Sequence, residues 1–162
     1  MHGFPAYVGI GSNLREPASQ VRAAFAALAA LPRTRLLRRS SLYGSHPMGP
    51  VEQPDFCNAV AGLLTELDAD ALFAALRAAE SQLGREPPRQ RWGPRVIDLD
   101  LLVYADQCRS DTHLTLPHPG IAARNFVLQP LNEIAPDLLV PGLGRVAQLA
   151  AKVPADGLWS MR

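Results

Sequence analysis

RWGPRVIDLDLLVY, residues 91–104, is the stretch of this sequence that says most about the fold. From Val96 onward it has the alternation of a β-strand, because successive side chains of a strand point to opposite faces. Asp98 and Asp100 therefore share one face and lie roughly 7 Å apart, at about 3.3 Å of rise per residue. One predicted face comprises Ile97, Leu99, Leu101 and Val103, and the other comprises Val96, Asp98, Asp100, Leu102 and Tyr104.

Two aspartates on one strand face need a reason, because Asp is a poor strand former and like charges repel. Oxygen ligands at this spacing suit Mg²⁺, which takes one or two carboxylates and completes its shell with water and substrate phosphate. Arginines precede the strand at Arg85, Arg89, Arg91 and Arg95. Carboxylates for a metal beside arginines for phosphate predict metal-assisted phosphoryl transfer.

The alternative for Asp98 and Asp100 is that they solvate the outer face of a half-exposed strand. Alternation alone favours this alternative. The Trp-Gly-Pro-Arg sequence at residues 92–95 and the arginine cluster favour the metal site instead.

Composition is that of an ordinary globular protein, and residues 1–162 are predicted to form a single domain. The net charge of +1 gives no field to attract nucleic acid or membrane, and no apolar run is long enough to span a bilayer. Two isolated cysteines, Cys57 and Cys108, favour a reducing compartment, and the four histidines lack zinc-ligand spacing. A cytoplasmic protein without nucleic-acid or membrane partners is expected.

The chain alternates between strands, helices and two proline-rich loops. Strands are predicted over residues 6–10, 35–43, 56–67, 96–104 and 114–116. Helices are predicted from Pro17 to Pro32, from the N-cap Asp68 to Leu83, from Ile121 to just before Pro130, and over 146–151. The first 104 residues thus read as a ferredoxin-like βαββαβ unit of the α+β class, an antiparallel sheet with helices packed on it. The remainder forms a C-terminal αβ extension.

The loops over residues 44–54 and 85–94 are candidate walls of a site above the aspartates. Trp92 and Phe56 suit the two sides of a planar heterocycle, and the Asn58 amide offers a donor and an acceptor to read its edge. Core packing is the alternative for both aromatic residues. The sequence has neither GxxxxGK[ST] nor GxGxxG after a strand, so a nucleotide would be held by arginine, metal and His118. The alternative for His118 is a surface position in a proline-rich turn.

RWGPRVIDLDLL resembles the signature of the 6-hydroxymethyl-7,8-dihydropterin pyrophosphokinase family of folate biosynthesis. Other matching segments follow in the family's order over nearly the whole chain. They are GIGSNL at 9–14, PMGP at 47–50, QPDF at 53–56, Asn58-Ala59, Glu80, LGR at 83–85, LTLPHP at 114–119, RNF at 124–126 and PLNEIAP at 130–136.

The resemblance implies transfer of a diphosphate from ATP to the hydroxymethyl oxygen of the pterin, with release of AMP. ATP is then a co-substrate, and two Mg²⁺ ions are expected on Asp98 and Asp100, where one would also lower the pKa of the attacking hydroxyl. The catalytic residues implied are Arg85, Arg95, Asp98 and Asp100. The ATP-site residues implied are Glu80, Arg91, Trp92, Arg95, Thr115, His118 and Arg124. The pterin-site residues implied are Ser45, Pro47, Met48, Phe56, Asn58, Trp92 and Phe126.

Four positions depart from the family's pattern. Arg77 stands where Gln is frequent, and Pro87 stands where a further loop arginine occurs. His113 and Pro119 replace an arginine and a tyrosine near the ATP. These departures leave the details of nucleotide contact open. The Pro87-Pro88 pair also predicts a stiffer loop with slower or smaller motion.

Two other functions fit parts of the pattern. Another two-metal nucleotidyl or phosphoryl transferase on a ferredoxin-like sheet would also need paired aspartates, but a nucleotidyl transferase would release pyrophosphate from ATP. It would leave the Pro-Met-Gly-Pro loop and the Phe56/Asn58 pair unexplained. An RNA-binding module would need stacked aromatics in an RNP-type strand and a basic face, and the sequence shows neither. A monomeric pyrophosphokinase is therefore expected.

Overall fold

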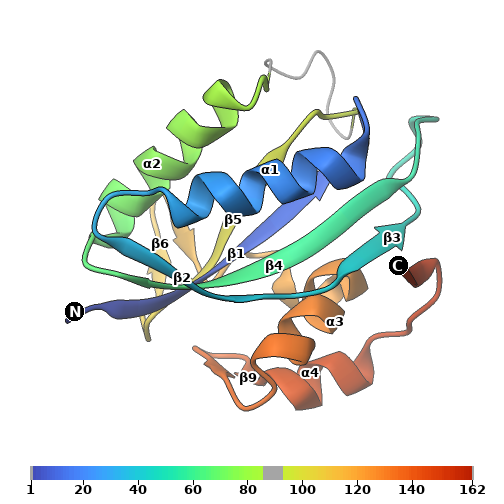
Figure 1. Ribbon diagram of the computed structural model, residues 1–162. Coiled ribbons are helices and arrows are strands. Elements are labelled where there is room, and N and C mark those ends of the chain that lie inside the picture. The colour runs from blue at the N-terminus through green and yellow to red at the C-terminus, as the bar shows by residue number, and fades with distance from the viewer. Residues whose placement is uncertain (1, 86–92, 162) are drawn as a thin grey trace.

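The computed structural model describes residues 2–85 and 93–161, and an antiparallel sheet covered by helices on both faces lies at its centre (Figure 1). One face carries α1 (Pro17–Ala29) and α2 (Ala69–Gln82), and the other carries α3 (Asn125–Ile134) and α4 (Val146–Lys152). The predicted N-cap of α2 is confirmed, because Asp68 accepts a hydrogen bond from the Ala71 N–H at 2.8 Å. Gly84 follows α2 at φ +96°, a left-handed conformation that suits glycine after a helix end.

The main sheet has the strand order β10-β3-β4-β1-β5, with β2 also paired to β4, and all of its pairs are antiparallel. Its strands are β1 (Phe4–Ser12), β2 (Thr34–Arg39), β3 (Leu42–Ser45), β4 (Phe56–Thr65), β5 (Asp98–Tyr104) and β10 (Leu158–Met161). With β2 and β3 taken as one broken strand, this is the ferredoxin-like order, so the predicted fold class is confirmed.

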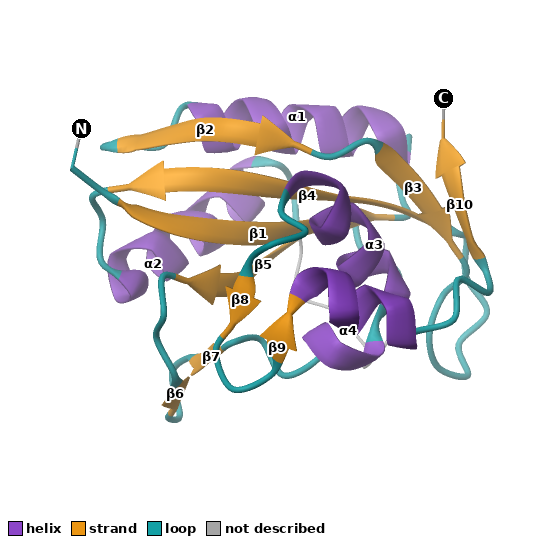
Figure 2. Ribbon diagram, turned by 90° about the horizontal axis from the view of Figure 1, so that it is seen from below, coloured by secondary structure: helices purple, strands orange, loops and turns teal. Residues whose placement is uncertain are grey.

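The rest of the chain forms the expected extension (Figure 2). Two short hairpins lie outside the main sheet, β6 (Arg109–Ser110) with β7 (Thr115–Leu116) and β8 (Leu139–Val140) with β9 (Gly144–Arg145). The 3₁₀ helix η1 (Ile121–Ala123) precedes α3. β10 pairs with β3 and thereby adds an outer strand that the sequence patterns did not predict. None of the helices in residues 2–85 and 93–161 is long and apolar enough to cross a membrane.

The single strand predicted over residues 35–43 is wrong, because the chain leaves the sheet pattern at Ser40 and Ser41 between β2 and β3. The Ser40 hydroxyl accepts a hydrogen bond from the Val60 N–H at 2.9 Å. The Ser41 N–H and hydroxyl donate to the carboxylate of Glu133 in α3, at 3.0 and 2.9 Å. Serine side chains that bond nearby backbone compete with a regular ladder, which explains the interruption.

The predicted faces of the strand at residues 96–104 are correct through Leu102, which lines the same cavity as Asp98 and Asp100, and are wrong for Val103 and Tyr104. The strand begins at Asp98, and its register with β1 shifts between Tyr7, opposite Val103, and Val8, opposite Leu101. A bulge turns the following side chains to the opposite faces. Tyr104 accordingly packs in the core under α1 and α2, whereas Val103 packs in the core under α3 and α4.

The helix expected to stop before Pro130 instead runs through it. α3 continues to Ile134, with Pro130 buried inside it. Its apolar stripe, which includes Leu128, Leu131 and Ile134, is buried against the sheet. Packing of such a stripe supplies most of a helix's stability in a protein, and here it outweighs the hydrogen bond that proline cannot make.

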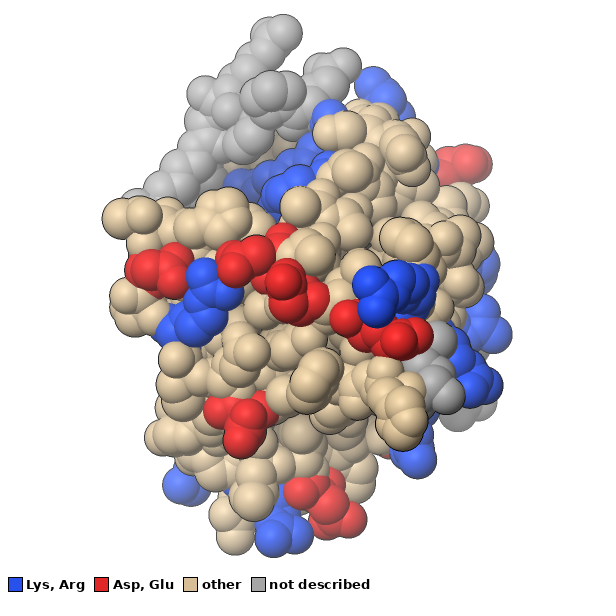
Figure 3. All heavy atoms as spheres, turned by 90° about the vertical axis from the view of Figure 1, so that its left-hand side faces the viewer, with Lys and Arg blue, Asp and Glu red and all other residues tan. Residues whose placement is uncertain are grey.

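Charged side chains of both signs lie beside one another on the face that carries the start of α2 (Figure 3). Arg109 is held there between Asp70, at 3.1 Å, and Asp111, at 2.9 Å. These contacts accord with the near-zero net charge of the sequence.

Candidate functional site

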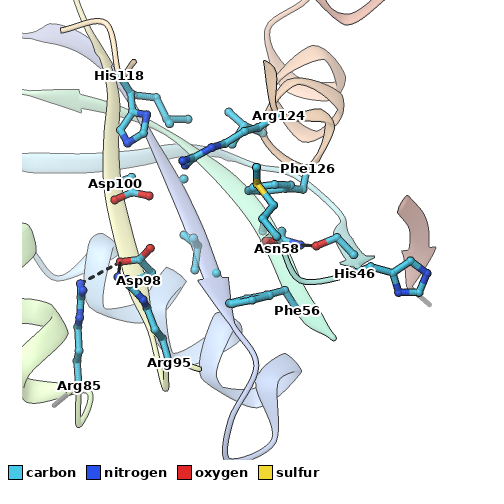
Figure 4. Close-up of a pocket in the computed structure, with 18 of the residues that line it drawn as sticks. His46, Phe56, Asn58, Arg85, Arg95, Asp98, Asp100, His118, Arg124 and Phe126 are labelled. Atoms are coloured by element: carbon cyan, nitrogen blue, oxygen red, sulfur yellow. Dashed lines mark hydrogen bonds and ion pairs between the residues drawn. The ribbon is translucent and has the colours of Figure 1, made fainter. Parts of the chain in front are cut away.

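A cavity of about 310 Å³ lies over strands β4, β1 and β5, on the side of the sheet covered by α3 (Figure 4). Its lining brings together residues that are far apart in the sequence. Eleven of the predicted site residues line it: Ser45, Met48, Phe56, Asn58, Arg85, Arg95, Asp98, Asp100, His118, Arg124 and Phe126.

Two glycines of β1 keep the floor of this cavity open beside the aspartates. Gly11 is paired with Asp98 and Gly9 with Asp100. Directly opposed residues of an antiparallel pair project to the same face, so larger side chains here would fill the space in front of the carboxylates. A Cβ at Gly11 would already lie 3.4 Å from the Asn58 Oδ1.

Asp98 is surrounded by arginine. Its Oδ1 lies 2.9 Å from Arg85 Nη1 and 3.5 Å from Arg95 Nη1, and Figure 4 shows both guanidinium groups reaching toward it. The Arg95 backbone is held by Asn13, whose Oδ1 accepts from the Arg95 N–H at 2.8 Å. The two arginines therefore compensate the charge of Asp98.

Asp100 differs, because no ion pair joins it to any of the described residues. Burial, and then repulsion from Asp98, raise the pKa of Asp100 to about 7, against an opposing effect of Arg77. A carboxyl with a raised pKa beside a second carboxylate is a favourable position for a cation.

The oxygen donors suit Mg²⁺ better than zinc. Within residues 2–85 and 93–161, no group of three or more His, Cys, Asp or Glu side chains is arranged to hold a metal. Two carboxylates in a partly open cavity are what Mg²⁺ uses when substrate phosphate and water supply its other ligands. Asp98 and Asp100 thus fit the ion that the sequence resemblance implies.

The opposite end of the cavity has an apolar character, with Phe56 and Phe126 there (Figure 4), and Met48 also lines the cavity. Asn58 is 4% exposed, and its Nδ2 donates to the Ser45 hydroxyl at 2.7 Å. Nδ2 also donates to the Tyr43 carbonyl oxygen at 3.4 Å, so both amide protons bond to the protein. The Asn58 Oδ1 and the Ser45 hydroxyl proton remain available to a ligand.

His118 and Arg124 line the cavity near Asp100 (Figure 4). The Gly120 N–H donates to His118 Nδ1 at 3.0 Å, so the proton of the neutral ring sits on Nε2. Burial, and then the charge of Arg124, lower the pKa of His118. A Cβ at Gly120 would lie 2.6 Å from the Arg124 Nε, so a larger residue here would displace the Arg124 side chain.

The other predicted site residues lie elsewhere. Glu80 is 3% exposed behind β5, and Thr115 lies in β7 outside the cavity lining. Pro47 is not among the lining residues, although its neighbours His46 and Met48 are. Arg91, Trp92 and the Pro87-Pro88 pair lie outside the described residues.

Glu80 has both carboxylate oxygens engaged by protein groups. Its Oε1 lies 3.0 Å from Arg77 Nη1, and its Oε2 accepts from the Leu99 N–H at 2.7 Å and from Arg85 Nη1 at 2.6 Å. Burial raises the pKa of Glu80, which the Leu99 N–H, Arg77 and Arg85 oppose. Glu80 is therefore placed to orient strand β5 and Arg85.

Sequence reasoning missed several lining residues. Gly9 and Gly11 carried a usable signal, since alternate glycines in a strand mark a close approach. Arg77 was noted only as a departure from the family's pattern, and His46 had no distinguishing signal. His46 points toward β10, where its ring lies 5.2 Å from that of Trp159.

Comparison with known proteins gives concordant matches. The model of the 7,8-dihydro-6-hydroxymethylpterin-pyrophosphokinase (HPPK) family matches residues 7–136. A 2-amino-4-hydroxy-6-hydroxymethyldihydropteridine pyrophosphokinase of Pseudomonas aeruginosa is 45% identical over 152 residues, which cover 94% of this chain and 93% of that protein. The protein of the same name from Haemophilus influenzae is 43% identical over 144 residues, which cover 89% of each.

Among solved structures, wild-type HPPK-DHPS of Plasmodium falciparum has a similar fold, with a TM-score of 0.73 and 13% sequence identity. The match covers 93% of this chain but only 43% of the Plasmodium chain. This likeness concerns the fold alone.

Proposed function

The chain belongs to the HPPK family, and on that premise we propose how its pocket transfers pyrophosphate from ATP to a pterin alcohol. The activity itself is pyrophosphate transfer to 6-hydroxymethyl-7,8-dihydropterin in folate biosynthesis, with small molecules as substrates. The hydroxymethyl oxygen forms a bond to the β-phosphorus of ATP. The bond from that phosphorus to the oxygen bridging it to the α-phosphorus breaks, and AMP leaves.

The observation that supports this assignment most is that an apolar, aromatic subsite and a carboxylate pair line one cavity. Phe56 and Phe126 lie in the same lining as Asp98 and Asp100. A flat ring and a polyphosphate need these two kinds of surroundings side by side. We propose that the pterin binds at the aromatic end, with Ser45, Pro47, Met48, Phe56, Asn58, Trp92 and Phe126 as its site.

Recognition of the ring edge is assigned to Asn58 and Ser45. The Asn58 Oδ1 accepts from a ring N–H, and Ser45 donates its hydroxyl proton. Because Asn58 is buried and already bonded to Ser45, the pair needs no rearrangement before binding. A site with fixed polar groups discriminates strongly against a ring that lacks their partners.

The triphosphate is assigned to the arginine end. Arg85 and Arg95 are forked donors that match phosphate oxygens, and both lie within 3.5 Å of Asp98. We propose that they exchange Asp98 for phosphate when ATP binds, and that they stabilise charge as it spreads during transfer. Arg91, Trp92, Thr115, His118 and Arg124, with Glu80 acting through its neighbours, complete the proposed ATP site.

Asp98 and Asp100 are the proposed ligands of two Mg²⁺ ions. Bound there, the ions supply charge neutralisation for the transferring group and a lower pKa for the attacking hydroxyl. The residues' own part is to hold two oxygen donors on one rigid strand face. The two side chains line one cavity, opposite glycines of β1, and this geometry supports a cation at this position.

We further propose that residues 1–162 form one domain that works as a cytoplasmic monomer, without nucleic-acid or membrane partners. The free thiols of Cys57 and Cys108 support a reducing compartment.

The test is to incubate the protein with ATP, Mg²⁺ and 6-hydroxymethyl-7,8-dihydropterin and to separate the adenine nucleotides by chromatography. AMP that forms only with the pterin present is the expected result. ADP would mean simple phosphoryl transfer, and pyrophosphate released with AMP joined to the pterin would mean a nucleotidyl transferase. Either of these products would overturn the proposal.

A further inference from the structure

Strand β5 has a free edge where the two aspartates lie. It pairs with β1 on one side, and no described strand pairs with its other side. In an antiparallel pair, both backbone groups of a residue point either to the partner strand or away from it. Leu99, which separates Asp98 from Asp100, directs both its N–H and its C=O to the free edge, toward α2.

Two side chains of α2 take the place of the missing strand. The Leu99 N–H donates to Glu80 Oε2 at 2.7 Å, and the Leu99 C=O accepts from Arg77 Nη2. Arg77 Nη1 in turn lies 3.0 Å from Glu80 Oε1, which closes the ring of contacts. We call Arg77 and Glu80 the edge clamp.

The edge clamp is itself held in position. The Arg77 guanidinium lies over the ring of Phe73, 4.9 Å from its centroid. The Arg77 Nε is buried and has no hydrogen-bond partner among the described residues. The guanidinium therefore keeps its contacts with Leu99 and Glu80 although one of its donors is unsatisfied. Glu80 also reaches Asp98 through Arg85, which lies 2.6 Å from Glu80 and 2.9 Å from Asp98.

We propose that Arg77 is a positioning residue that, through the edge clamp, fixes the backbone between Asp98 and Asp100 and so sets the affinity of the pair for divalent cations. This inference rests on the proposed metal role of the two aspartates. A guanidinium suits the task because its fork bonds the Glu80 carboxylate and the Leu99 carbonyl together, which a lysine ammonium does less well. Groups behind metal ligands typically change metal affinity or activity by about 10- to 100-fold when removed.

The rival role for Arg77 is direct contact with phosphate, since it also lines the cavity. The two roles differ in what happens to Leu99. A positioning residue protects the Leu99 amide before any substrate binds, whereas a phosphate ligand has no effect on it.

The experiment compares the wild-type chain with Arg77→Met, Arg77→Lys and the control Arg109→Met. Arg109 also ties a strand to α2 through a carboxylate, but at Asp70, at the other end of the helix. Amide hydrogen exchange at Leu99 is measured by NMR without ligands. Mn²⁺ binding is measured by electron paramagnetic resonance with a non-hydrolysable ATP analogue, and thermal melting reports the global fold.

In Arg77→Met we expect Leu99 exchange to accelerate and Mn²⁺ affinity to fall about 10-fold, with melting close to that of Arg109→Met. Arg77→Lys should recover part of both effects, and Arg109→Met should change neither. Unchanged Leu99 exchange in Arg77→Met, with weaker binding of the ATP analogue, would make Arg77 a phosphate ligand and overturn the inference. Unchanged Mn²⁺ affinity would overturn it as well.

The Mn²⁺ measurement on the wild-type chain distinguishes failure of the proposed function from failure of this inference. If the wild-type chain itself binds no Mn²⁺ in the presence of the ATP analogue, the metal site is wrong and the inference falls with it. If the wild type binds Mn²⁺ normally and Arg77→Met does so equally well, only the inference falls.

Discussion

The two ends of the cavity are built in opposite ways. At the aromatic end, Asn58 lies in β4, and β4 has strands on both sides. Asn58 is 4% exposed and hydrogen-bonded to Ser45. At the arginine end, Asp98 lies on the edge strand β5, and its side chain is 26% exposed and held by Arg85 and Arg95. Side chains at the aromatic end are held in position by the sheet, and those at the arginine end by ion pairs.

This difference teaches where each end should be sensitive. A substitution of a buried residue in a central strand removes both its hydrogen bonds and its packing contacts. Changes at the aromatic end should therefore alter both ligand binding and stability. Partly exposed ion pairs contribute little to stability, and their partners can be exchanged. Changes at the arginine end should therefore alter turnover and leave the melting temperature nearly unchanged.

The largest effect is expected for Asp100→Ala and Asp98→Ala. Each removes an oxygen donor of the proposed cation site, and turnover should fall by more than about 10³-fold. Melting should stay at or above that of the wild type, because the buried Leu99 and Leu101 remain and the repulsion between carboxylates is relieved. Near-wild-type turnover of either variant in the AMP assay would show that the arginine end does not carry the chemistry.

Arg95→Ala should have the next largest effect. By analogy with the loss of one preorganised charge-stabilising donor, kcat should fall by about 10²- to 10³-fold. Steady-state kinetics at saturating substrates measures this, and Arg145→Ala, which removes a surface ion pair with Asp137, is the control. A rise in the KM for ATP with unchanged kcat would make Arg95 a ground-state binder.

Asn58→Ala tests the aromatic end. Its removal leaves Ser45 without its donor and the ring edge without an acceptor, and we expect the KM for the pterin to rise by about 10- to 100-fold. The KM for ATP should not change, and melting should fall. Equal increases in both KM values would mean that the two ends are not separate sites.

Tyr43→Phe should give the smallest effect, which is confined to stability and its pH dependence. Burial and the bond from the Tyr43 hydroxyl to Glu133, at 2.6 Å, raise the pKa of Tyr43 to about 12. Its folded-state pKa lies above the unfolded value of 10.0, so its contribution is complete below pH 10 and is lost as pH rises toward 12. Chemical denaturation should show a steeper fall in the free energy of unfolding over this range for the wild type than for Tyr43→Phe. Equal slopes would contradict the assignment, and turnover at neutral pH should be unchanged.

Much of the fold could be predicted because its signals are local. The N-cap at Asp68 and the proline at the start of α1 act within one helical turn, and both elements begin where the sequence indicates. The predicted faces of the 96–104 strand are correct through Leu102 for the same reason. They fail at the bulge, whose position depends on how Tyr7 and Val8 of another strand pair with it.

The candidate site divides in the same way. The pairing of β1 with β5 places Gly9 and Gly11 opposite the aspartates. The sequence around residues 98–100 does not indicate which strand pairs with β5. Glu80 was expected at the ATP by resemblance alone, and the sequence did not indicate its contacts with Leu99, Arg77 and Arg85. Those contacts exist because α2 packs along the free edge of β5.

The sequence by itself determined the order of the elements, the common face of Asp98 and Asp100, and the family to which the motif belongs. These depend on side-chain alternation, caps and residue identity, which act over a few neighbouring positions. Only the tertiary structure decided that, among the described residues, Asp98 forms ion pairs with arginines and Asp100 does not, and that Arg77 and Glu80 complete the edge between them. Ion pairs and edge contacts join segments whose proximity arises only when the sheet and α2 come together.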